Sequence, residues 1–164
     1  MQIGHGAIRG RGRAALLLLL ALVGFAVSTY LASFQLGFIA TVWDPLFGSG
    51  SERVLTSAVS RMLPVPDASL GAAAYGVDGL LAVALLVRPD GPAWLAAALT
   101  VVATVGAMTG LVLTLFQPLV ARAFCSLCLV SAGVSVGLAI GAAGELGGRL
   151  DRRRTDHRSQ GGFA

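Results

Sequence analysis

Charged residues are scarce in this chain of 164 residues, at 12%, whereas apolar residues make up 55%. A soluble domain carries roughly 25% charged residues, so this chain has too few to cover a water-facing surface. All twelve basic residues are arginines, and they lie in the tails and between apolar runs. This distribution excludes a nucleic-acid-binding face, despite the net charge of +4, and is typical of a membrane protein.

Histidine and cysteine are scarce as well. His5 and His157 both lie in the tails, outside every apolar run, which argues against haem, whose iron is usually held by such a side chain. Cys125 and Cys128 are the two cysteines, and a structural zinc ion usually takes four protein ligands. A zinc site would therefore need ligands from a second chain, and we predict no metal site.

Four apolar segments are long enough to cross a membrane, since a spanning helix needs about 20 residues. They cover about 14–40, 68–87, 92–120 and 124–143. The first follows three arginines, as the core of a cleaved signal peptide would, but its length favours a retained helix.

These segments predict an all-α fold, an integral membrane four-helix bundle. The bundle occupies residues 14–144, between an N-terminal tail (1–13) and a C-terminal tail (145–164) that is charged, glycine-rich and expected to be disordered. Four spans place both termini on one side of the membrane, together with the turn at Arg88. That side holds nine arginines and the other side three. Because cytoplasmic segments carry the excess of basic residues, we predict a multi-pass cell-membrane protein with both termini in the cytoplasm.

The longest connection, 41–67, is then extracytoplasmic, and its pattern predicts a short amphipathic helix. Ser49 and Glu52 have the spacing of a capping box. Apolar residues follow at helical spacing, which suits a helix lying at the membrane interface: Val54, Leu55, Ala58, Val59 and Met62. Trp43 has the position of an interfacial aromatic anchor. A solvated linker remains the alternative.

The cysteines form the motif Cys125-Ser126-Leu127-Cys128 at the outer end of the fourth segment. Positions i and i+3 share a helix face, so the two sulfurs can meet. A helix N-terminus stabilises a thiolate, which would make Cys125 the better nucleophile, and the outer compartment permits disulfides. The motif favours a redox-active pair. A structural disulfide, half of a metal site and two buried packing residues remain alternatives.

The chain resembles the vitamin K epoxide reductase family in its bacterial form. The resemblance covers about residues 14–144 and rests on the four spans, the long outer loop and the run Phe124-Cys125-Ser126-Leu127-Cys128-Leu129. Pro66, Gly71 and Tyr75 are similar to that family's entry into the second span. The resemblance implies a membrane thiol–disulfide oxidoreductase whose helices surround a non-covalently bound quinone, either menaquinone or ubiquinone.

The resemblance also implies roles for the cysteines. Cys125 would exchange with the thiol of a partner, an extracytoplasmic thioredoxin-like or other thiol-bearing protein, and Cys128 would lie beside the quinone ring. Two polar residues are further candidates for quinone binding. Asp78 falls near the middle of the second span, where a carboxyl is costly and functional by default, although it could instead hydrogen-bond a neighbouring helix. Gln117, near the outer end of the third span, could donate to a quinone carbonyl.

One feature departs from the family pattern. Members usually carry a second cysteine pair in the outer loop, which relays electrons to the CxxC motif, but residues 41–67 contain no cysteine. Only sulfur exchanges with thiols at useful rates, so either a partner thiol reaches Cys125 directly or the activity differs. A non-catalytic membrane subunit that binds or anchors a partner or lipid is therefore the alternative function.

Overall fold

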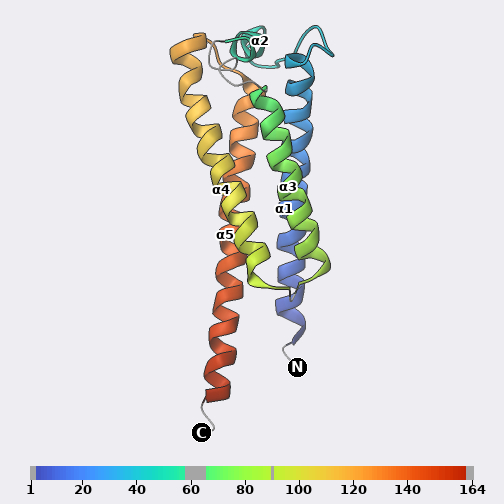
Figure 1. Ribbon diagram of the computed structural model, residues 1–164, viewed down its shortest axis with the longest axis vertical. Helices are drawn as coiled ribbons and strands as arrows, with labels where there is room; N and C mark the ends of the chain where they lie inside the picture. The colour runs from blue at the N-terminus through green and yellow to red at the C-terminus, as the bar shows by residue number, and fades with distance from the viewer. Residues whose placement is uncertain (1–2, 58–65, 90, 162–164) are drawn as a thin grey trace.

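The computed structural model describes residues 3–57, 66–89 and 91–161. Its main elements are four long helices, α1 (Ile3–Gln35), α3 (Asp67–Val87), α4 (Ala93–Phe116) and α5 (Ser126–Gly161). They stand side by side, and a short helix, α2 (Gly50–Leu55), lies across one end (Figure 1). No strand occurs in these residues, so the predicted all-α four-helix bundle is confirmed.

The long helices supply four segments that are apolar and long enough to cross a membrane, and the third of them extends past the end of α4. These segments are Gly10–Gln35, Asp67–Val87, Ala93–Ala121 and Ser126–Thr155. Large apolar side chains are exposed along the outside of the bundle, as expected of surfaces that face lipid rather than water. The chain is therefore a multi-pass membrane protein.

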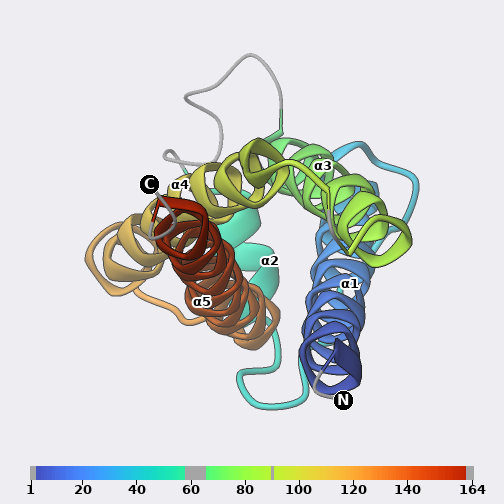
Figure 2. The same cartoon turned by 90° about the horizontal axis from the view of Figure 1, so that it is seen from below.

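The helices form a closed ring in the order α1, α3, α4, α5, with successive helices running in opposite directions (Figure 2). Both termini lie at one end, together with the turn between α3 and α4, and α2 lies at the other (Figure 1). We call the end with α2 the capped end. α1 contacts both α3 and α5, so it packs as part of the bundle.

Small side chains let the helices approach one another closely. The hydrophobic core consists of alanine, leucine and one tyrosine: Ala14, Leu17, Ala21, Tyr75, Ala82, Leu85, Leu95, Ala96, Leu99, Ala103, Leu138 and Ala142. In a membrane, where apolar faces gain nothing by leaving lipid, such close contact is what holds helices together.

The first span ends earlier than predicted, because α1 stops at Gln35 and not near residue 40. Gly37 adopts a left-handed conformation (φ +80°). The N–H of Gly37 donates to the carbonyl of Phe34, and that of Phe38 donates to the carbonyl of Ser33. This is a Schellman motif, which satisfies the last carbonyls of a helix and stops it.

Both tails continue the helices. α1 begins at Ile3 and α5 runs to Gly161, although disorder was predicted from residue 145 onward. The physical reason is cooperativity, since each residue added to an existing helix gains a hydrogen bond without a new nucleation cost.

The predicted amphipathic helix is only partly present. α2 begins after its N-cap residue Ser49, as the sequence indicated, but the Ser49 side chain makes no capping hydrogen bond. Glu52 instead accepts a hydrogen bond from the N–H of Val42 (3.1 Å), so it ties α2 to the preceding loop. Ala58, Val59 and Met62 lie outside the described residues.

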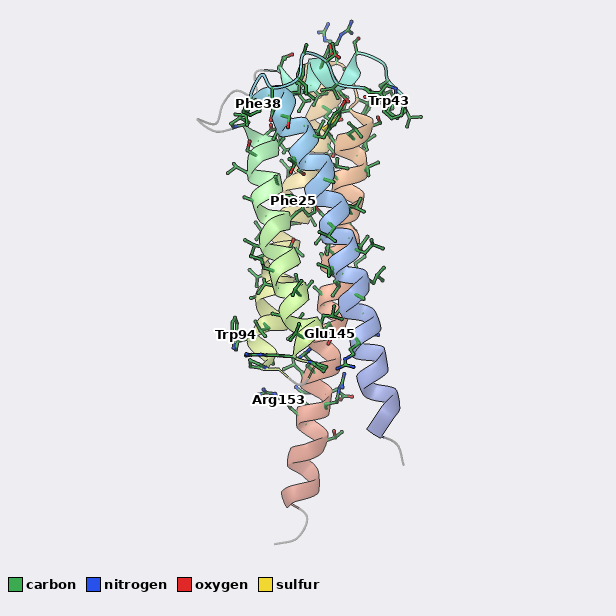
Figure 3. The ribbon with its side chains drawn as sticks, turned by 90° about the vertical axis from the view of Figure 1, so that its right-hand side faces the viewer. Phe25, Phe38, Trp43, Trp94, Glu145 and Arg153 are labelled. Carbon is green, nitrogen blue, oxygen red and sulfur yellow. A yellow bond between two sulfur atoms is a disulfide. The ribbon has the colours of Figure 1, made fainter. Side chains whose placement is uncertain are left out.

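Aromatic side chains mark both ends of the bundle. Trp43 at the capped end and Trp94 at the opposite end are 73% and 63% exposed, and both point away from the helices (Figure 3). This is the distribution expected of residues at the two membrane–water interfaces.

Candidate functional site

The two cysteines lie at the first turn of α5 and form a disulfide. Cys125 directly precedes the helix and its carbonyl accepts from the N–H of Leu129 (3.0 Å). Its sulfur accepts a hydrogen bond from the N–H of Cys128 (3.1 Å). Cys125 therefore acts as the N-cap of α5, with sulfur in place of the usual oxygen.

Gln117 holds the other side of Cys125. It begins a π-helical turn, η1 (Gln117–Ala121), at the end of α4. Pro118 lacks an N–H and cannot continue regular helical hydrogen bonding, and π turns are frequent at functional sites. Gln117 is buried, and its Oε1 accepts from the N–H of Cys125 (3.1 Å). The structure thus brings together three of the four predicted site residues.

Asp44 covers the cysteines from the loop between α1 and α2. It is buried and accepts hydrogen bonds from the N–H groups of Leu46 (3.0 Å) and Phe47 (2.9 Å). Ser51 Oγ donates to Oδ2 (2.6 Å), and the backbone N–H and hydroxyl of Ser126 also donate to the carboxylate. The Ser51 oxygen in turn lies 3.1 Å from Cys125 Sγ.

These contacts fix the charge of Asp44. Burial alone would raise the pKa of its carboxyl, but the hydrogen bonds from Ser126, Ser51, Phe47 and Leu46 outweigh burial and lower the pKa far below the ordinary value of 3.8. Asp44 is therefore an anion at every physiological pH.

The α5 N-terminus was expected to activate Cys125 through its free N–H groups. In the structure these groups have different acceptors, because the N–H of Ser126 donates to Asp44 while that of Cys128 donates to the sulfur of Cys125. The positive end of α5 is therefore shared between a sulfur and a permanent carboxylate.

A cavity of about 730 Å³ lies below the cysteines, among the four long helices and α2. Cys128 and Gln117 line it, whereas Cys125 is fully buried and is not part of its wall. Much of the remaining wall is apolar, including Leu31, Leu55, Val101, Val105, Leu113 and Phe116. Cys128 is thus the sulfur that faces the cavity.

A hydroxyl cluster lies on the cavity wall between α3 and α5. Tyr75 Oη donates to the carbonyl of Ser131 (2.6 Å), and it lies 2.7 Å from Ser135 Oγ and 2.9 Å from Ser131 Oγ. Gly24 makes room for the ring, because a Cβ there would lie 2.3 Å from it. The cluster fixes the level at which α3 faces α5.

Asp78 lies on the same wall but deeper. It follows Tyr75 by three residues, and Tyr75 already contacts Ser135, which lies two turns, or about 10 Å, beyond Cys128 along α5. Asp78 is 3% exposed, lines the cavity, and its Oδ1 has no hydrogen-bond partner among the described residues. The alternative of a hydrogen bond to a neighbouring helix thus has no support at Oδ1.

Three residues of the site had no signal of their own in the sequence. Asp44 and Ser51 come from a loop far away along the chain, and nothing in their spacing points to Cys125. Ser126 lies between the cysteines, but serine is common at helix starts and gives no hint of a distant partner.

A family model for the vitamin K epoxide reductase family matches residues 15–143. The chain belongs to the vitamin K epoxide reductase family. The comparison with curated proteins gives no match. Membership in the vitamin K epoxide reductase family indicates a membrane thiol–disulfide oxidoreductase, and it agrees with the resemblance on which the sequence prediction rested.

Proposed function

We propose that the protein passes electrons from a thiol-bearing partner, through Cys125 and Cys128, to a quinone in the cavity. The observation that carries the proposal is the position of Cys128, which is bonded to Cys125 and also faces a largely apolar cavity. A pair that is reached from one side by thiols and from the other by a lipid-soluble acceptor can connect the two.

The cavity residues fit a quinone. Its volume of about 730 Å³ lies within the usual range for small-molecule sites, which are mostly apolar with a few placed polar groups. Gln117 uses its Oε1 for Cys125, which orients the amide N–H groups as donors suited to a carbonyl oxygen. Oδ1 of Asp78 lacks a partner among the described residues, and the hydroxyl of a reduced quinone would satisfy it. A quinone bound there supplies a two-electron, two-proton acceptor.

The residues of the chain then have distinct tasks. Cys125 and Cys128, when reduced, form their disulfide and release two electrons and two protons. Cys128 is the sulfur on the cavity side, and Gln117 positions Cys125 while presenting its amide to the bound ring. We assign Asp78 to the inner end of the cavity, where Oδ1 holds or releases a proton.

Thiol trapping in native membranes tests the proposal. The pair should be oxidised in membranes that contain quinone and become reduced when quinone synthesis is blocked, and added menaquinone or ubiquinone should restore the disulfide and tell the two apart. Cys128→Ser should trap a mixed disulfide between Cys125 and the partner, and Cys125→Ser serves as the matched control. If the redox state of Cys125 and Cys128 did not change when quinone is removed, the proposal would be wrong.

The second candidate is a non-catalytic subunit that keeps the family fold to bind or anchor a partner or lipid. The lack of cysteine in 41–67 and the complete burial of Cys125 favour it. Complementation separates the two functions, because a Cys125→Ala, Cys128→Ala double variant should restore a deletion strain fully only if the protein is a scaffold.

We further propose that the protein lies in the cell membrane with its termini in the cytoplasm. Nine of the twelve arginines belong to the termini and the turn beside them, and the structure places these segments at the same end (Figure 1). Fusion of a reporter active only in the cytoplasm to the C-terminus should give signal, whereas an alkaline phosphatase fusion, active only outside, should give none.

A further inference from the structure

The segment 44–51 closes the capped end directly over Cys125, and we call it the cap segment. Cys125 and Ser51 are both 0% exposed. Gly50 packs so tightly on the backbone of Phe124 that a Cβ would lie 2.3 Å from the Phe124 carbonyl oxygen. The ring of Phe47 packs against that of Phe124, with centroids 5.7 Å apart. No thiol can reach Cys125 while these contacts persist.

One residue fastens the cap segment to α5. Asp44 accepts from Leu46 and Phe47 within the segment, and from Ser126 at the start of α5. Hydrogen bonds to a carboxylate are roughly twice as strong as neutral ones. Asp44 is therefore the strongest polar connection between the cap segment and the residues that flank Cys125.

The same carboxylate places a charge beside the sulfur. Ser51 has one proton, and the 2.6 Å contact with a charged acceptor takes it in preference to the 3.1 Å contact with Cys125. Ser51 therefore turns its lone pairs towards Cys125, with the Asp44 charge directly behind. Arg53 and Arg122 lie at the same end, but no ion pair joins them to Asp44 in the described part of the chain.

We propose that Asp44 is a positioning residue for thiol exchange, which holds the cap segment shut over Cys125 and selects against anionic thiols. The inference rests on the proposed function, since it takes Cys125 as the sulfur that thiols attack. In that step a thiolate bonds to Cys125 Sγ, the bond to Cys128 breaks, and Cys128 leaves as a thiolate that takes up a proton. A second thiolate then breaks the mixed disulfide, so two thiols lose two electrons and become one disulfide.

This geometry defines the chemistry of the partner. An attacking thiolate brings a negative charge towards a fixed carboxylate, and any further acid near the thiol adds to the repulsion. The partner that suits this site is a protein thiol flanked by neutral or basic groups, whereas small acidic thiols are disfavoured.

The test measures chemical reduction of the Cys125–Cys128 disulfide in the purified full-length protein in detergent, without quinone. Two thiols of similar size are compared, neutral 2-sulfanylethanol and anionic 2-sulfanylethanesulfonate. In Asp44→Asn, both should reduce the disulfide about tenfold faster, because the cap segment is released. The ratio of the anionic to the neutral rate should also rise by about threefold, because the charge is gone.

Two variants separate the closing of the cap segment by Asp44 from the effect of its charge on anionic thiols. Ser126→Ala keeps the Asp44 charge but removes the hydroxyl that donates to it, so both rates should rise while their ratio stays at the wild-type value. Glu52→Gln removes a different carboxylate that ties the loop at Val42, and it should change neither rate by more than about twofold. Circular dichroism confirms that each variant remains folded.

The outcomes are decisive in both directions. If Asp44→Asn and Ser126→Ala were both reduced at the wild-type rates, the claim that Asp44 holds the cap segment shut would be wrong. If the ratio of the anionic to the neutral rate were unchanged in Asp44→Asn, the claim that Asp44 selects against anionic thiols would be wrong. Equal acceleration by Glu52→Gln would show general loosening of the loop and would also overturn the proposal. Quinone is absent from this assay, so a negative result for Asp44 would not contradict the proposed electron transfer to quinone. Likewise, a negative result for quinone in native membranes would not contradict the role of Asp44 measured here.

Discussion

The hydroxyl oxygen of Ser51 lies 3.1 Å from the sulfur of Cys125, and both residues are fully buried. The outer loop of this family member has no cysteine, yet one of its side chains already reaches the cysteine pair. Ser51→Cys should therefore place a thiol within bonding reach of Cys125, and the two sulfurs should form a disulfide without any rearrangement of the cap segment.

The bridge can be measured directly when Cys128→Ser removes the competing sulfur. Cyanogen bromide cleaves after Met62 and Met108, which separates positions 51 and 125 onto different fragments. These fragments should migrate together until they are reduced. Ser49→Cys, at an exposed position two residues away, is the matched control, and equal bridge yields in both variants would contradict the geometry.

Asp78 should lower the stability of the ligand-free fold while contributing to quinone-dependent oxidation of the cysteines. Its Oδ1 is buried without a partner among the described residues, so Asp78→Leu should stabilise the ligand-free protein by about 1–3 kcal/mol. The same variant should lower quinone-dependent oxidation of the cysteines about tenfold or more. Thermal unfolding in detergent and thiol trapping measure the two effects. If Asp78→Asn and Asp78→Leu changed neither quantity, both the functional and the structural role would be wrong.

The fold was largely predictable from the sequence, because membrane spans depend on composition alone. A helix in lipid must satisfy its own backbone, so long apolar runs with few charges have few alternatives. The ends were less predictable. The first span stops at Gln35 because of the left-handed Gly37, and hydropathy does not distinguish that glycine from others. The C-terminal tail has a composition typical of disorder, but it continues a helix that is already formed.

The candidate site was predictable only in its local parts. The pairing of Cys125 and Cys128 follows from their spacing, and the burial of Asp78 follows from its place in a span. The contacts of Ser51 and Asp44 with the start of α5 join residues 74 and 82 positions apart, respectively. Such contacts depend on where the loop folds back, and no periodicity encodes that.

Protection of the cap segment should depend on pH through Asp44. Its pKa is lowered, because donors from Ser51, Ser126 and the backbone outweigh the effect of burial. A lowered pKa in the folded state contributes stability that is complete above the ordinary value of 3.8 and is lost as the pH falls through the folded value. The groups that contact Asp44 are hydroxyls and N–H groups, so they do not titrate in this range.

Pepsin, which is active in acid, provides the measurement. Cleavage between Leu46 and Phe47 should be slower in the wild type than in Asp44→Asn at about pH 4.5, and the difference should shrink as the pH falls towards 2. A difference that persisted unchanged to the lowest pH would show that Asp44 does not hold the segment through its charge.

Gly24 should tolerate no side chain. A Cβ there would lie 2.3 Å from the Tyr75 ring, and the ring is fixed by its hydrogen bonds to Ser131 and Ser135. Gly24→Ala should therefore destabilise the bundle by about 1–3 kcal/mol. Gly133→Ala is the control, because nothing lies within 4 Å of a Cβ at that position. Equal melting temperatures for the two variants would mean that α1 and α3 do not meet as described.

At the end opposite the cap, a buried ion pair should decide whether the turn between α3 and α4 stays in place. Arg149 Nε lies 3.0 Å from Glu145 Oε1, and Arg149 Nη1 donates to the carbonyl of Gly91 (2.9 Å). Arg149 and Glu145 are only 8% and 3% exposed. Arg149→Ala leaves the Glu145 charge buried without its partner, and such losses cost about 3–5 kcal/mol.

The expected result is a large fall in melting temperature for Arg149→Ala and a partial recovery when Glu145→Leu is added, since the second change removes the stranded carboxylate. Arg152→Ala is the matched control, because Arg152 is exposed and donates to the carbonyl of Gly148 on its own helix. The exposed arginine should cost less than about 0.5 kcal/mol. If the double variant were as unstable as Arg149→Ala, the hydrogen bond to Gly91, and not the charge of Glu145, would account for the loss.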